Sequence, residues 1–324
     1  MIIIQLAGGL GNQMFQYALS LQLKNLGKTV KIDDVSGFVQ DGQRTPALVP
    51  FGIAYERATW RELEEMLDSS PLLWHRIRRK LCGRKKKAYF EADKAYHPEI
   101  MEWDNIYLEG YWQTEKYFQA VSDQVKTVFD TDRLLQYLKK LEDKNLQRCL
   151  EEITSTESVS VHIRRGDYLL PENQALFGSI CTEAYYDAAM ERMNREHPEC
   201  FFYLFTNDKA WARKWVAEGR PVAAGRIKVM DLKDMEGGSM AADYAEFMLM
   251  SRCRHNILAN SSFSWWASYL NKNADKTVLA PDRWLNGWDC RDFYRVDMHK
   301  IPSAAAVAKR AGQRSDYVCN RQHG

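Results

Sequence analysis

The chain has 324 residues, of which 45% are hydrophobic and 27% are charged, as in ordinary globular proteins. This composition excludes a disordered chain. The 45 basic and 43 acidic side chains leave a net charge of +2, which excludes a general attraction to nucleic acid. Because one domain has about 150 residues as a rule, the length predicts two domains.

The first part of the chain alternates between strand and helix. Apolar residues 2–6 predict a strand, which a glycine turn at residues 8–11 joins to a helix through residue 23, and residues 29–32 predict a second strand. Parallel strands need such a helical crossover. Residues 1–155 are therefore expected to form an N-terminal Rossmann-like domain.

A second alternation of the same kind follows the polar stretch at residues 151–157. Strands are predicted at residues 158–163, 201–205, 227–230, 256–259 and 277–280, and helices are predicted between them at residues 182–195, 241–251 and 264–270. Residues 156–300 are therefore expected to form a second Rossmann-like domain, so the fold class is α/β. For residues 301–324, a C-terminal tail, no role is predicted.

The glycine turn is a candidate anion site. GGLGNQM follows a strand and opens a helix, where backbone N–H groups and the helix dipole favour a phosphate. Gly9, Gly11 and a downstream acid at Asp33 or Asp34 half-match the dinucleotide fingerprint, so an NAD-dependent oxidoreductase is one alternative. A tight turn without a ligand is another.

The strongest single motif is HIRRGDY at residues 162–168, which ends a predicted strand where open α/β sheets bind ligands. With a side-chain period of two, His162 and Arg164 share one face and Arg165 points to the other. The planar fork of Arg164 suits a diphosphate, and Gly166 allows a turn that brings Asp167 back toward the same place. The alternative for Arg165 is an ion pair with Asp167.

Two later strand ends converge on the same edge. Asn207 and Asp208 follow one strand, and residues 260–264 follow another. Such polar residues also cap helices, which remains an alternative for Asn207 and Asp208. The second segment has more polar side chains than one cap needs, which favours a ligand there.

Three further features have competing interpretations. Asp130 and Asp132 resemble a D-x-D metal motif, but the helical periodicity that follows favours a helix start. A basic cluster with interleaved apolar residues at 76–87 is typical of a helix on an anionic membrane, with a solvated helix face as the alternative. The histidines show no metal-like spacing with cysteines, so no metal site is predicted.

The motifs, taken together and in order, resemble the bacterial α-1,2-fucosyltransferases of glycosyltransferase family eleven. The carrying segments are GGLGNQMFQYA at 8–18, GYWQTEKYF at 110–118, VHIRRGDY at 161–168, FTND at 205–208 and NSSFSWWASYL at 260–270. The histidine and arginine segment is shared more widely, with α-1,6- and protein O-fucosyltransferases. Transfer of those kinds therefore stays an alternative.

The resemblance implies a GT-B fold, in which an acceptor-facing N-terminal domain and a donor-binding C-terminal domain face each other across a cleft. It implies inverting transfer of L-fucose from GDP-fucose to the 2-hydroxyl of a terminal galactose on an oligosaccharide or glycolipid, with no metal and no other cofactor. Arg164 would bind the β-phosphate, and His162 and Asp243 the guanosine. The remaining donor contacts would come from Asn12, Arg165, Asn207, Asp208, Ser262, Phe263 and Ser264.

Asp167 is the candidate general base, because a base near the acceptor hydroxyl would remove its proton. A manganese-dependent transferase using Asp130 and Asp132 and a glycan-binding protein without turnover are further alternatives.

The cysteines and the hydropathy bear on location. The seven cysteines form no C-x-x-C pair and cannot all pair within one chain, which favours free thiols in a reducing compartment. No apolar run approaches the ~18 residues of a membrane span, and MIIIQL is typical of a first strand rather than a signal peptide. The expected location is the cytoplasm, with peripheral contact at the inner face of an anionic membrane through the basic cluster.

Overall fold

A computed structural model describes residues 1–303 except 40, 43, 84, 233, 234 and 236; the tail expected at 301–324 therefore lies almost wholly outside the described residues. The chain divides into two compact units. Unit 1 contains Met1–Arg133 and Arg291–Tyr294, and unit 2 contains Leu134–Cys290 and the chain from Arg295 onward. The division falls before the joint expected at residue 155, because the helices between Leu134 and that joint pack with unit 2.

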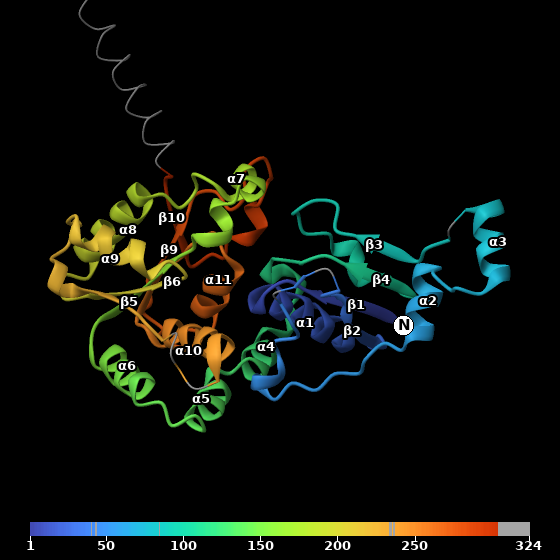
Figure 1. The fold of residues 1–324 in the computed structure, drawn as a ribbon, viewed down its shortest axis with the longest axis horizontal. Helices are drawn as coiled ribbons and strands as arrows, with labels where there is room; N and C mark the ends of the chain where they lie inside the picture. The colour runs from blue at the N-terminus through green and yellow to red at the C-terminus, as the bar shows by residue number, and fades with distance from the viewer. Residues whose placement is uncertain (40, 43, 84, 233–234, 236, 304–324) are drawn as a thin grey trace, which may run out of the picture. The chain divides into compact units, whose positions relative to one another are not determined.

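Unit 1 is built on a parallel sheet in the order β2-β1-β4-β3 (Figure 1). Its strands are β1 (Ile2–Ala7), β2 (Val30–Gly37), β3 (Ala88–Phe90) and β4 (Ile106–Glu109). The strand, helix and strand predicted near the N-terminus are confirmed. The last two strands were not predicted, because each is short and flanked by irregular chain.

The helices of unit 1 are α1 (Leu10–Asn25), α2 (Trp60–Leu67), α3 (Leu73–Cys82) and α4 (Ser122–Val128), and α5 (Thr131–Lys139) crosses into unit 2. Among these helices, α1 and α2 contact the sheet, whereas α3 lies apart from it (Figure 1). Short 3-10 helices are η1 (Val49–Phe51), η2 (Pro98–Met101), η3 (Glu115–Tyr117), η4 (Gln119–Val121) and η7 (Arg291–Phe293). Thr59 and Glu62 form a capping box that fixes the start of α2.

Unit 2 is built on a parallel sheet in the order β10-β9-β8-β5-β6-β7. Its strands are β5 (Ser158–Ile163), β6 (Phe201–Thr206), β7 (Ile227–Val229), β8 (His255–Ile257), β9 (Val278–Pro281) and β10 (Met298–Ile301). In sequence order this is the 3-2-1-4-5-6 arrangement of a Rossmann sheet. The predicted α/β class and the predicted strands of this half are confirmed, and β10 adds an edge strand that was not predicted.

The helices of unit 2 cover both faces of the sheet, with α8 and α9 on one face and α6 and α10 on the other (Figure 1). They are α6 (Lys144–Ser155), α7 (Pro171–Phe177), α8 (Glu183–Glu196), α9 (Lys209–Ala217), α10 (Gly238–Arg252) and α11 (Ser262–Tyr269), with the 3-10 helices η5 (Gly166–Leu169) and η6 (Ala224–Arg226). All six residues of β5 are buried, as a central strand covered on both faces requires.

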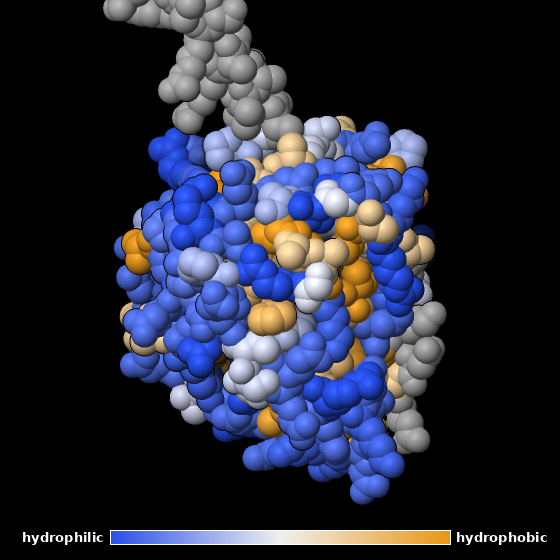
Figure 2. Space-filling view, turned by 90° about the vertical axis from the view of Figure 1, so that its left-hand side faces the viewer, coloured by the Kyte–Doolittle hydropathy of each residue, from blue (hydrophilic) through white to orange (hydrophobic). Residues whose placement is uncertain are grey.

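The side of the molecule that carries α8 and α9 is mostly hydrophilic, with a smaller group of apolar side chains near its middle (Figure 2). Charged outer faces keep such helices in water while their inner faces pack on the sheet. Among the described residues, no helix is long and apolar enough to cross a membrane.

Candidate active site at the carboxyl edge of the second sheet

The sheet of unit 2 changes direction between β5 and β8. From β5 the chain moves outward through β6 to β7, and it then returns to the other side of β5 to form β8, β9 and β10. The segments that leave the carboxyl ends of β5 and β8 therefore lead to opposite sides of the sheet. Open α/β sheets bind nucleotides at this topological switch point.

His162 lies at this point and has an unusual environment. Its side chain is buried, its ring centroid lies 5.6 Å from that of Phe263, and among the described residues its Nδ1 atom has no hydrogen-bond partner. Burial, followed by the positive charge of Arg164, lowers the pKa of His162 to about 3, so the ring is neutral near pH 7. A buried polar atom without a partner is costly, which makes this nitrogen a candidate ligand contact.

Arg164 follows two residues later and is partly exposed at the same edge. Its guanidinium carbon lies 5.7 Å from the centre of the Tyr168 ring. Tyr168 is itself fixed, because it stacks on Phe177 at 4.4 Å and donates a hydrogen bond to the carbonyl of Asn260 at 3.0 Å. The arginine therefore lies beside an aromatic side chain that bridges the segments following β5 and β8.

Asp243, on α10, gives the site its acidic group. Desolvation raises the pKa of Asp243, and the positive charges of Arg164 and Lys209 oppose the rise. Arg164 thus interacts electrostatically with both His162 and Asp243, two residues predicted from different parts of the sequence.

The side chain of Arg165 does not join His162 and Arg164 but packs on the segment that follows β6, where it has a structural role. Its Nε atom pairs with Asp208 at 3.3 Å, its guanidinium carbon lies 4.0 Å above the ring of Trp211, and its backbone N–H donates to Asn207 at 2.9 Å. Asp208 also caps α9 by accepting a hydrogen bond from the Trp211 amide at 3.1 Å. Asn207 and Asp208 therefore hold the loop after β5, and a direct donor contact of these three residues stays a prediction.

Gly166 makes the turn that the sequence predicted. Its φ is +53°, and a Cβ atom there would lie 2.5 Å from Nδ2 of Asn207. Asp167 follows within η5, but its side chain lies outside the described part of the structure. Its role as a general base stays a prediction.

The start of α11 follows β8 and lies on the other side of the switch point from the segment that follows β5. Ser261 caps this helix by accepting a hydrogen bond from the Phe263 amide at 3.3 Å. Ser264 is fully buried, and its hydroxyl donates to the carbonyls of Ala259 and Ser261. Ser262 and Phe263 are partly exposed. The helix therefore presents its first N–H groups beside Phe263 and His162, where a helix N-terminus favours an anion.

Unit 1 brings two of the family-like segments together. Asn12 accepts a hydrogen bond from Nε2 of Gln113 at 2.6 Å, and Gln16 donates to the carbonyl of Gly110 at 2.8 Å. Gln13 is buried and holds the chain at residues 45–47. The two glutamines of GNQMFQ thus have a structural role that the sequence did not reveal. A donor contact of Asn12 stays a prediction.

In the structure, Asp33 and Asp34, the acidic residues on which the NAD alternative depends, interact with other side chains and backbone groups of the protein. Asp33 is buried and accepts hydrogen bonds from the amides of Val35 and Ser36 and from the hydroxyl of Tyr107 at 2.8 Å. Asp34 pairs with Arg57 at 2.8 Å. Neither carboxylate is available to a ribose, which weakens the NAD alternative.

The D-x-D alternative also has a structural explanation. Asp130 accepts a hydrogen bond from the amide of Asp132 at 3.0 Å, and α5 begins between them at Thr131. This is the helix start that the periodicity favoured.

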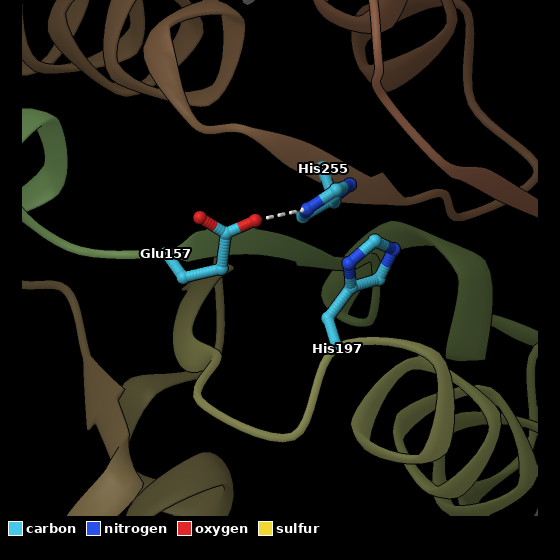
Figure 3. A group of neighbouring side chains, drawn as sticks. All are labelled: Glu157, His197 and His255. Atoms are coloured by element: carbon cyan, nitrogen blue, oxygen red, sulfur yellow. Dashed lines mark hydrogen bonds and ion pairs between the residues drawn. The ribbon is translucent and has the colours of Figure 1, made fainter.

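A cluster of Glu157, His197 and His255 lies at the opposite, amino end of the second sheet (Figure 3). Its three candidate ligand atoms lie within 4.8 Å of one another, a proximity that sequence spacing did not predict. The centroids of the two rings lie 3.8 Å apart, with the ring planes tilted by 31°. Nδ1 of His255 accepts the Thr277 amide at 3.0 Å, so Nε2 must carry the proton that it shares with Glu157 at 2.8 Å. A protonated Nε2 of His255 does not suit a metal.

Open parallel sheets of the α/β class bind nucleotides at such a switch point, where this chain has Arg164, the start of α11 and a histidine whose Nδ1 has no partner among the described residues. The model of glycosyl transferase family 11 matches residues 85–294. The chain belongs to this family.

Similar proteins come from several organisms. An α-1,2-colitosyltransferase of Escherichia coli is 30% identical over 90% of this chain and 95% of its own length. The O-antigen biosynthesis glycosyltransferase WbnK of Escherichia coli is 29% identical over 87% and 94%. A galactoside α-(1,2)-fucosyltransferase 1 of Ateles belzebuth is 27% identical over 84% of this chain and 66% of its own.

A solved structure with a similar fold is the fucosyltransferase NodZ from Bradyrhizobium, with a TM-score of 0.41 and 14% identity over 82% of this chain and 91% of that chain.

Proposed function

We propose that the chain transfers L-fucose from GDP-fucose to the 2-hydroxyl of a terminal galactose, with inversion and without a metal ion. The observation that carries this proposal is the buried Nδ1 of His162, which has no partner in the described part of the chain and lies beside Arg164 at the switch point of the second sheet. Membership of glycosyl transferase family 11 and the names of the similar proteins support the reaction class.

Arg164 supplies the positive charge that the reaction needs. When the sugar leaves GDP, negative charge grows on the diphosphate while the sugar becomes cation-like, so donors fixed at the leaving group lower the barrier. A guanidinium offers two parallel N–H groups to a phosphate. The N-terminus of α11, with Ser262 and Phe263, adds dipolar stabilisation at the same place.

In this proposal, His162 and Asp243 bind the guanosine of the donor. A neutral imidazole offers one donor or acceptor at the orphaned Nδ1, and a carboxylate accepts from the N–H groups of a base. Asn12, Arg165, Asn207, Asp208 and Ser264 complete the donor set, in part by holding the loops that carry the direct contacts.

Inversion requires a single displacement, in which the acceptor hydroxyl attacks from the face opposite GDP. The hydroxyl loses its proton during this step, and we assign Asp167 as the general base. The C1–O bond to GDP breaks as the C1–O bond to the acceptor forms, and the proton passes to the carboxylate.

Metal independence is tested with a chelator. In EDTA the enzyme is expected to keep full activity, because Arg164 and α11 supply the charge that a divalent ion would otherwise supply. Loss of turnover in EDTA, restored by manganese but not by buffer alone, would instead favour a metal-dependent transfer.

A second candidate function is transfer of colitose, which the similarity to an α-1,2-colitosyltransferase favours. Colitose is L-fucose without its 3-hydroxyl. A site that hydrogen-bonds this hydroxyl rejects the deoxy sugar strongly, whereas an apolar site accepts both. Competition between GDP-fucose and GDP-colitose for one acceptor, followed by mass spectrometry of the product, distinguishes the two.

The main experiment is incubation with GDP-fucose and a small panel of galactosides, followed by linkage analysis of the product. An α-1,2-linked fucose on galactose is the expected result. A 1,6 linkage, or glycan binding without turnover, would overturn the proposal, and binding of NADH in place of GDP would favour the dinucleotide alternative.

We place the reaction in the cytoplasm, on an oligosaccharide or glycolipid acceptor. The odd number of cysteines and the nucleotide-sugar donor support this location. Contact with a membrane is the subject of the next subsection.

A further inference from the structure

Helix α3 has its polar face turned inward. Arg78 and Arg79 are the best-covered side chains of its basic positions, and both approach Asp68, a buried carboxylate. Arg79 also donates to the carbonyl of Ser70 at 2.7 Å. None of the residues of α3 is buried. The helix is therefore attached to unit 1 through its arginines and not through apolar packing.

The apolar side chains of α3 form an exposed stripe. Leu73, Trp74, Ile77 and Leu81 occupy positions i, i+1, i+4 and i+8, which lie on one side of a helix. Trp74 and Leu81 are 74% and 78% exposed. We call these four residues the apolar stripe. An amphipathic helix in water normally buries such a stripe against the core, so this orientation indicates a surface that is covered by a partner.

The surroundings of the stripe are positively charged. Arg76 and Lys80 lie on the same helix and are exposed, and Lys85 and Lys86 follow in the segment that leads to β3. No acidic residue occurs from position 69 to position 90. A second copy of the chain would bring these charges against one another, whereas an anionic surface would neutralise them.

We propose that α3 is a membrane-docking helix that inserts the apolar stripe into the headgroup region of an anionic bilayer. Arg76, Lys80, Lys85 and Lys86 then contact lipid phosphates, as in other interfacial helices. Trp74 suits this depth, because its indole is apolar with one polar N–H. The proposal also adds to the proposed function, because a lipid-linked acceptor would be bound at this membrane surface. Only this statement about the acceptor rests on the proposed function.

The position of α3 in unit 1 fits docking that leaves the sheet edge free. The helix precedes β3, so it lies at the end of the sheet where the parallel strands begin (Figure 1). Asn12 follows β1 and lies at the opposite end, where the strands finish. A bilayer on the stripe would therefore leave the carboxyl edge of this sheet uncovered.

The test is sedimentation of the full chain with vesicles of phosphatidylglycerol and phosphatidylcholine, compared with vesicles of phosphatidylcholine alone. The anionic vesicles are expected to capture the protein, and roughly 0.5 M NaCl to weaken capture at least about tenfold. Trp74→Ser with Leu81→Ser should reduce capture by a similar factor. Trp60→Ser, at a position that is 71% exposed on α2, is the matched control and should change nothing.

Two double variants that each remove two positive charges complete the test. Arg76→Gln with Lys80→Gln should weaken capture, whereas Lys24→Gln with Arg195→Gln removes the same charge from exposed positions elsewhere and should have a smaller effect. Unchanged thermal melting shows that each variant folds. Failure of anionic vesicles to capture the wild type, or equal capture of the stripe variant, overturns the proposal.

Two further outcomes separate the alternatives. Dimerisation on gel filtration that the stripe variant abolishes would assign the stripe to a second copy and overturn the membrane proposal. Turnover of GDP-fucose with a soluble galactoside, measured on the same samples, tests the proposed function separately. Capture without turnover leaves docking intact, and turnover without capture leaves the transferase intact.

Discussion

At the scale of single residues, Arg164 carries the charge of the proposed reaction. Arg164→Ala should lower kcat with GDP-fucose on the order of a hundredfold, because one preorganised donor to a developing anion is lost. Arg164→Lys should recover only part of the rate, since an ammonium lacks the planar fork. Steady-state kinetics of product formation measure both effects.

The matched control is Arg192→Ala, which removes an arginine that pairs with Glu196 on the surface of α8 at 2.8 Å. This variant should keep its turnover. Near-normal kcat in Arg164→Ala would contradict the assigned role.

His162 should make stability depend on pH. Its folded pKa is about 3, below the value of 6.5 for an exposed histidine, so the unfolded chain binds a proton that the folded chain does not. Its contribution to the free energy of unfolding is therefore complete above pH 6.5 and declines as the pH falls toward 3. The slope for one such group is at most about 1.4 kcal/mol per pH unit.

Urea unfolding between about pH 7.5 and pH 5 measures this effect. The wild type should lose more stability across this range than His162→Gln, which has no group titrating there. Equal losses in the two proteins would show that the histidine is not buried in its neutral form.

The site residues differ in how far sequence alone could predict them. The period of two along β5 correctly separated His162 and Arg164 from Arg165, because a strand end has only two faces. The partner of Arg165 was not predictable, since Asp208 lies 43 positions further along and local patterns favoured Asp167. The unpartnered Nδ1 of His162 depends on everything packed around it, which no motif contains.

At the scale of elements, the turn after β5 depends on Gly166. Gly166→Ala should destabilise unit 2 by about 1–2 kcal/mol, because an alanine at positive φ is strained. Its Cβ would also displace Asn207, whose side chain holds the backbone of Arg165. Turnover should therefore fall together with stability.

Gly219→Ala separates the two effects. Gly219 follows α9 with φ +89°, and apart from its two chain neighbours no described residue has an atom within 4 Å of the place that an alanine methyl group would take, so only the backbone strain is added. This control should lose stability and keep turnover per folded molecule. If both variants kept turnover, Asn207 would have no role in shaping the site.

Long elements were predicted well and short ones were not. The helices α8 and α11 have side-chain caps at Thr182 and Ser261, α10 is a long run of mostly apolar residues, and β5 and β6 have six residues each. The strands β3 and β10 have three and four residues, and they are strands only because a neighbour provides the ladder. The orientation of α3 was not predictable either, because its sequence is compatible with packing of either its apolar face or its basic face against the protein.

At the scale of the whole molecule, the two units are not consecutive in sequence. The chain enters unit 2 after Arg133, returns to unit 1 for Arg291–Tyr294 and leaves it again at Arg295. Within unit 1, Asp292 accepts hydrogen bonds from Nζ of Lys116 at 2.6 Å and from the amide of Tyr96 at 2.9 Å. Composition and periodicity contain no signal for such a return.

Asp292→Ala should destabilise unit 1 by about 1–3 kcal/mol, because a mostly buried carboxylate with two partners is removed. Lys116→Ala should cost less, since the lysine is half exposed and the amide of Tyr96 keeps its partner. Urea unfolding of the single and double variants measures the coupling between the two residues. Strict additivity would show that their ion pair contributes nothing.

Arg295 is the first residue of unit 2 after the segment Arg291–Tyr294, and it is buried and holds the chain in this unit. It donates to the carbonyl of Trp265 at 3.2 Å and to the hydroxyl of Ser268 at 3.0 Å, and it pairs with Asp297 at 2.9 Å.

Because Arg291–Tyr294 belong to the unit that also contains Met1–Arg133, the two units cannot be separated at a single peptide bond. A ribosome would have to add nearly two hundred residues after Tyr96 before the amide of Tyr96 could meet the carboxylate of Asp292. Truncated expression clones of the N-terminal half would consequently need a grafted 291–294 peptide to restore that contact.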